Sequence, residues 1–95
     1  MSVSHSSAAR ELPLLLGPGQ GTAESLMLVG APDTQGVVHV RTWTSDDWGA
    51  PPRTSAERAD TLLKWLEVQG RAGRTMNQSL YTVRLWLRGE GSAPR

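Results

Sequence analysis

The chain of 95 residues contains no cysteine, so disulfide bonds and thiolate metal sites are excluded. Its two histidines, His5 and His39, are too few and too far apart in the sequence for a zinc cluster. GPGQG at residues 17–21 lacks the spacing of a phosphate-binding loop. No apolar run approaches the roughly 18 residues of a membrane-spanning helix. The sequence therefore predicts no metal, no cofactor and no membrane association.

Lysine is almost absent as well, because Lys64 is the only one among ten cationic residues. The formal net charge is +1, so no strong field steers the whole molecule toward nucleic acid. The preference for arginine is typical of a GC-rich, bacterial genome, although arginine also suits planar stacking and bidentate contacts. The N-terminus lacks the charged start and long apolar core of a secretory signal. We therefore expect a cytoplasmic protein.

The length predicts one small domain with polar ends that are rich in glycine and proline. We expect residues 1–23 to be a flexible N-terminal arm with a short apolar anchor at residues 11–16, where Pro13 favours the edge of a sheet. Residues 24–89 are the predicted domain, and residues 90–95 a disordered tail. Because so small a core gives little stability, a partner or a second copy is favoured.

Strand-like apolar patterns occur at three places after the N-terminal arm. Residues 25–30 and 37–44 read as the strands of a hairpin, joined by turn formers at residues 31–36. A surface loop rich in proline is expected over residues 45–53. Residues 79–89, SLYTVRLWLRG, alternate between apolar and polar side chains and are interpreted as the clearest strand of the protein.

One helix is predicted before the last strand. Residues 54–57 have the spacing of a capping box, and the helix that follows is expected to end at Gly70. Its apolar stripe consists of Ala56, Ala59, Leu62, Leu63 and Leu66. Because such a stripe must be buried, the helix is expected to pack on one face of a three-stranded sheet. The predicted fold class is α+β, a small two-layer domain of β-β-α-β order whose opposite sheet face is open.

The pattern Arg-x-Trp occurs twice, in residues 37–44 and in residues 79–89. Because side chains alternate across a strand, both copies are expected on the sheet face without a helix. A third row from Met27 and Val29, or from Leu26 and Leu28, would complete this surface. The predicted Arg/Trp platform consists of His39, Arg41, Trp43, Arg84, Trp86 and Arg88, and Trp48 extends it from the adjacent loop.

Three uses of the Arg/Trp platform remain open. Trp and Arg are the residues most enriched at binding hot spots, which favours a non-catalytic adaptor or regulatory module that binds a protein partner or forms a homodimer. Alternatively, the platform stacks the bases of single-stranded RNA, while Arg71 and Arg74 contact the nucleic-acid backbone. The third use is structural only, because stacked Arg and Trp side chains also shield a bare sheet.

The sequence offers no set of convergent catalytic groups. Asp46 and Asp47 are adjacent and diverge on any regular element, and His39 has no carboxylate beside it in its strand. A domain of this size also has little volume for a catalytic pocket. We therefore predict no enzymatic activity and no catalytic residue.

Overall fold

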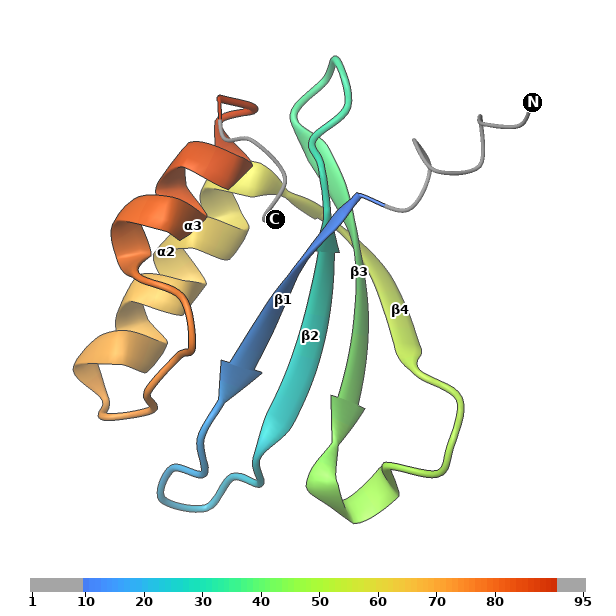
Figure 1. Cartoon of the computed structure of the whole chain (residues 1–95), viewed down its shortest axis with the longest axis vertical. Coiled ribbons are helices and arrows are strands. Elements are labelled where there is room, and N and C mark those ends of the chain that lie inside the picture. The colour runs from blue at the N-terminus through green and yellow to red at the C-terminus, as the bar shows by residue number, and fades with distance from the viewer. Residues whose placement is uncertain (1–9, 91–95) are drawn as a thin grey trace.

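The computed structural model describes residues 10–90, which form four strands followed by two helices (Figure 1). The strands are β1 (Glu11–Leu16), β2 (Ser25–Gly30), β3 (Val37–Thr44) and β4 (Arg53–Arg58), with the 3-10 turn η1 (Ser45–Asp47) between the last two. The helices are α2 (Ala59–Arg71) and α3 (Leu80–Leu87). The α+β class is confirmed, but the predicted three-stranded sheet and the order β-β-α-β are wrong.

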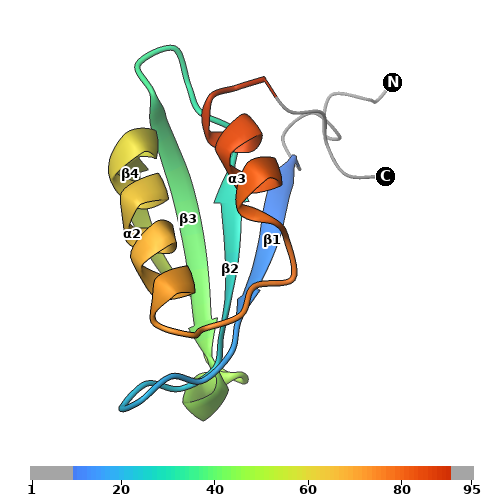
Figure 2. The ribbon, with the colours of Figure 1, turned by 90° about the vertical axis from the view of Figure 1, so that its left-hand side faces the viewer.

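The four strands pair in chain order, each antiparallel to the next. Both helices cover the same face of the sheet, α2 toward β4 and α3 toward β1, which leaves the other face open over residues 10–90 (Figure 2). The core between the two layers consists of Leu12, Leu14, Leu16, Met27, Val29, Val38, Val40, Ala59, Leu62, Leu66, Val83, Trp86 and Leu87.

Residues 80–87, which the alternating pattern assigns to a strand, form helix α3. The segment also satisfies a helical period, because Val83, Trp86 and Leu87 recur at helical spacing and are buried. Tyr81, which the strand pattern places in the core, is 66% exposed. Short apolar segments fit both periods, and here the packing of a second helix on the sheet decides between them.

Both ends of α3 are capped by local sequence. The Ser79 hydroxyl accepts a hydrogen bond from the N–H of Thr82 at 3.1 Å. At the other end, Gly89 has a φ of 77°, and the N–H groups of Gly89 and Glu90 donate to carbonyls of the last turn in a Schellman motif. These two signals specify a helix that the alternation concealed.

The boundaries of α2 also differ from the prediction. Residues 54–57 lie in β4 rather than in a capping box, and α2 begins at Ala59 after Arg58, whose side chain makes no cap. Pairing with β3 satisfies the backbone of residues 54–57 in place of helical hydrogen bonds. The helix continues past Gly70, and the left-handed residue that ends it is Gly73, with a φ of 89°.

Residues 11–16 are an integral strand of the sheet rather than an anchor on a flexible arm. Leu12, Leu14 and Leu16 are at most 1% exposed, so the domain begins before the predicted boundary at residue 24. Pro13 lies in the edge strand β1, as its missing N–H predicts. Residues 1–9 of the predicted arm and residues 91–95 of the predicted tail lie outside the described residues.

The outer edge of β1 is partly closed by the segment between the helices. The N–H of Leu15 donates to Asn77 Oδ1 at 2.8 Å, and the N–H of Gly17 donates to the carbonyl of Thr75 at 3.1 Å. Such contacts reduce the number of unpaired backbone groups along this edge. By contrast, none of the described residues pairs with the outer edge of β4.

Candidate functional site

The open face of the sheet is built from alternate side chains of its strands. In β3, His39, Arg41 and Trp43 point to this face because Val38 and Val40 point into the core. His39 and Arg41 are exposed, and Trp43 is partly exposed. This half of the Arg/Trp platform lies where the two-residue period of the strand predicts.

Apolar side chains from three strands gather around Trp43. The register places Leu26 of β2 between Leu15 of β1 and Trp43 of β3. The neighbouring row adds Pro13 and Leu28, which are also opposite one another. Leu15 is 46% exposed, and the other four are partly exposed. We call Pro13, Leu15, Leu26, Leu28 and Trp43 the open-face patch.

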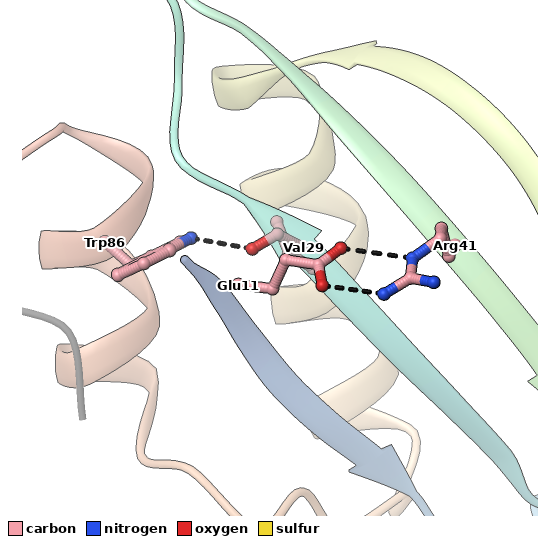
Figure 3. Close-up of polar contacts among 4 residues, drawn as sticks. All are labelled: Glu11, Val29, Arg41 and Trp86. Atoms are coloured by element: carbon pink, nitrogen blue, oxygen red, sulfur yellow. Dashed lines mark hydrogen bonds and ion pairs between the residues drawn. The ribbon is translucent and has the colours of Figure 1, made fainter. Parts of the chain in front are cut away.

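An ion pair crosses β2 at the border of this patch. Arg41 donates from Nη2 and Nε to the two carboxylate oxygens of Glu11, at 2.7 and 3.2 Å (Figure 3). This bidentate hydrogen bond and the charge of Glu11 raise the pKa of Arg41 above its ordinary value. The Arg41 guanidinium also stacks on Trp43, 5.6 Å from the ring centroid. The pair therefore orients Trp43 and neutralises most of the charge beside it.

Trp86 lies on the opposite side of the sheet, so the Arg/Trp platform as predicted does not exist. The residue is only 3% exposed, and its Nε1–H donates to the carbonyl of Val29 at 3.0 Å (Figure 3). A weaker hydrogen bond reaches the carbonyl of Gly30 at 3.3 Å. The prediction fails because residues 80–87 are helical, which turns Trp86 into the core. Trp86 is therefore a buried contact between α3 and the sheet and does not lie on the open face.

The other residues predicted from the last segment are also displaced from the open face. Arg84 of α3 forms an ion pair with Glu67 of α2 at 3.1 Å, on the helical side. Arg88 is the exposed residue that follows the last turn of α3. Trp48 is 47% exposed in the loop after η1. Trp48 is the one of these residues whose segment lies next to Trp43. Asp47, which precedes Trp48 in the chain, lines a small groove together with Trp43.

Arg71 and Arg74, the residues predicted to contact nucleic acid, do not act together. Arg71 is exposed at the end of α2. Arg74 is only 7% exposed, and its guanidinium donates to the carbonyls of Gly17 and Ala23, each at 2.7 Å. A buried side chain that joins the β1–β2 connection to the end of α2 is not available to a phosphate.

Two features of the surface escape the sequence-based prediction. Glu11 was assigned to an arm, although the alternation of leucines after it is the signal of a strand. The second feature is a groove of about 330 Å3 between α2 and the sheet, which we call the α2–β4 groove. Its lining includes buried Val40 together with Ser55, Glu57 and Trp65, and the Trp65 ring is 42% exposed.

Comparisons of the chain with protein-family models, with curated proteins and with solved structures found no match. Within residues 10–90, no helix is both long and apolar enough to cross a membrane. In the same part of the chain, no three side chains of His, Cys, Asp or Glu are grouped so that they could hold a metal ion. The candidate site is therefore defined by the geometry of the open face alone.

Proposed function

We propose that this protein is a non-catalytic binding module that recognises a protein partner through the open face of its sheet. The observation that carries the proposal is the open-face patch, in which Trp43 and four apolar neighbours lie side by side without a covering layer among residues 10–90. Contiguous exposed apolar surface is typical of interaction sites, and Trp is the residue most enriched at their hot spots.

The chemistry of the face favours a protein over a nucleic acid. Arg41 is neutralised by Glu11, and Arg58, also on this face, lies 3.7 Å from Asp60. Binding a phosphate backbone requires cations that are free to replace counterions. An apolar patch with a paired charge at its border instead suits a protein surface with an apolar centre and a polar rim. Base stacking on Trp43 is therefore an outcome of the test rather than a second proposal.

The test is capture of partners from extract of the native cell by the tagged protein, with and without nuclease. We expect a protein band that survives nuclease and disappears with Trp43→Ala and with Leu28→Gln. Tyr81→Ala is the matched control, because Tyr81 is an exposed aromatic residue on the helical side. Circular dichroism establishes that each variant is folded.

Three results would contradict the proposal. Captured material that disappears after nuclease would indicate a nucleic-acid ligand. A band that is lost equally with Tyr81→Ala would place the contact on the helical side. Capture of no chain other than a second copy of this protein would also contradict it, and light scattering of the Trp43→Ala variant would then test whether the open face mediates that self-association.

A further inference from the structure

Strand β4 lies at the edge of the sheet with its outer side unpaired by any described residue (Figure 1). The N–H of Ala59 donates to the carbonyl of Gly36, and these two residues are the next opposite pair in the β3–β4 register. The backbone groups of Ala59, and of every second residue before it in β4, therefore face β3. Since these groups alternate along a strand, those of Thr54 and Ala56 face outward. This edge therefore offers complete donor and acceptor pairs to another strand.

The side chains of β4 carry two opposite charges at symmetric places. Arg53 and Glu57 each lie two residues from Ser55, and all three point to the helical side, because their partners in β3 include buried Val40. Neither Arg53 nor Glu57 forms an ion pair with another described residue. The edge strand thus has an unpaired cation, Arg53, before its midpoint and an unpaired anion, Glu57, after it.

We propose that a second copy of this chain pairs with β4, antiparallel, about a two-fold axis that passes beside Ser55 and perpendicular to the sheet. In this register, Arg53 of each copy lies opposite Glu57 of the other, and the ion pair forms twice. Thr54 lies opposite Ala56, so the outward backbone groups of these two residues exchange hydrogen bonds. One short segment, RTSAE, is therefore complementary to itself.

Neighbouring registers lack this complementarity. An axis at Ala56 places Glu57 opposite Ser55 and leaves Arg53 beyond the strand, whereas an axis at Thr54 places Arg53 opposite Ser55. Pro52 precedes the strand and has no N–H to donate, which limits the paired edge to the residues around Ser55. Only the axis at Ser55 joins opposite charges.

The surroundings of Glu57 have space for the incoming arginine. Glu57 lines the α2–β4 groove together with Ser55 and the exposed ring of Trp65. A guanidinium from the second copy that enters this groove meets a carboxylate and an aromatic face, the two groups that arginine prefers. The packing of α2 does not explain why Trp65 is exposed. In the dimer, its ring contacts the guanidinium of Arg53 from the second copy.

Pairing at this edge continues the sheet from one copy into the other, with the helices of both copies on the same face. The two open-face patches then lie on one continuous surface. The dimer forms through the edge of β4 and not through the open face, so its existence is independent of the proposed function. Loss of partner capture with Trp43→Ala reports on the face, whereas loss of the dimer reports on the edge.

The test is a charge exchange followed by sedimentation at about 50 mM salt, where ion pairs are weakly screened. Arg53→Glu and Glu57→Arg, each alone, place like charges opposite one another and are expected to weaken the dimer about tenfold or more. An equimolar mixture of the two variants again brings opposite charges together and is expected to restore dimers. Arg71→Glu is the control for charge reversal away from β4.

A cross-link tests the register in a chain that has no cysteine of its own. Ser55→Cys places the two thiols in a non-hydrogen-bonded pair, whose Cα atoms lie about 4.5 Å apart, within the range that a disulfide spans. Oxidation is expected to give a covalent dimer with Ser55→Cys and much less with the control Thr54→Cys. The proposal would be overturned if the native chain stayed monomeric to about 1 mM or if neither charge reversal weakened the dimer. It would also be overturned if Thr54→Cys formed more covalent dimer than Ser55→Cys.

Discussion

Replacing Trp86 by phenylalanine separates the role that the structure gives this residue from the role that its sequence pattern indicated. The substitution keeps an aromatic ring but removes the Nε1–H that donates to the carbonyl of Val29 at 3.0 Å. If Trp86 anchors α3 to the sheet, the native fold loses stability. Trp43→Phe is the matched control, because the same change at a partly exposed ring on the open face removes no hydrogen bond to a described residue.

The magnitude follows from two losses at a site that is 3% exposed. The Val29 carbonyl keeps its partner in the sheet, Leu12, so loss of the second donor costs about 0.5–1.5 kcal/mol, the net value of one hydrogen bond. The smaller ring also leaves a space, at about 24 cal/mol per Å3 that the neighbours do not fill. We therefore expect Trp86→Phe to lower the free energy of unfolding by about 1–2.5 kcal/mol, out of roughly 5–14 kcal/mol for a chain of 95 residues. Trp43→Phe is expected to cost about 0.5 kcal/mol or less.

Urea unfolding followed by far-ultraviolet circular dichroism measures both variants without relying on tryptophan fluorescence. With a slope of about 1–2 kcal/mol per molar urea, the midpoint of Trp86→Phe is expected about 0.5–2.5 M below that of the native chain. The midpoint of Trp43→Phe should stay within a few tenths of a molar. Equal midpoints for Trp86→Phe and the native chain would refute the assignment of Trp86 to the core.

Two further predictions concern local hydrogen bonds. The N–H groups of Val37 and, to a smaller extent, Gln35 donate to the Asp33 carboxylate and lower its pKa below the ordinary value of 3.8. The ionised carboxylate therefore stabilises the β2–β3 turn above pH 3.8, and this contribution to stability is lost as the pH falls through the lowered pKa. Asp33→Asn should therefore lower the melting temperature at pH 7, and the difference from the native chain should narrow below about pH 3.8; a constant difference over pH 2–7 would contradict this. Ser79→Ala removes the cap of α3 and should cost about 1 kcal/mol, seen as a decrease of about 4–8 °C in calorimetry; an unchanged melting temperature would argue against the cap.

The strand β3 was predictable because only one period fits its residues. Val38 and Val40 alternate with His39 and Arg41, and β-branched residues at every second place specify both the strand and its inner face. Placement of Trp43 on the open face followed from the same alternation. This half of the candidate site therefore required no tertiary information.

The last segment was not predictable from alternation, because its eight residues satisfy two periods at once. Val83 and Leu87 are four residues apart and lie on one face of either a strand or a helix. The signals that decide between them are at the ends, in the Ser79 cap and the left-handed Gly89, rather than in the apolar pattern. The prediction of the Arg/Trp platform was wrong for this reason, because a strand period places Trp86 on the open face whereas the helix places it in the core.

The edge strand β4 lay beyond the reach of periodicity for a different reason. RTSAER has no buried residue, so hydrophobic alternation carries no information about it. Its spacing of Thr54 and Glu57 fits a helix start, and only pairing with β3 overrides this local preference. Residues at an edge are specified by the neighbouring strand and not by their own sequence.

The closure of β1 by residues 74–77 has a consequence for the order in which the protein assembles on the ribosome. The four strands pair with their neighbours in the sequence, so the meander can form as it emerges. The bond from Leu15 to Asn77 spans 62 residues, and that from Arg74 to Gly17 spans 57. At ordinary rates of synthesis, the first strand therefore waits several seconds for the groups that complete its edge. A nascent chain that ends before residue 74 has all four strands, but the first of them is exposed to other chains.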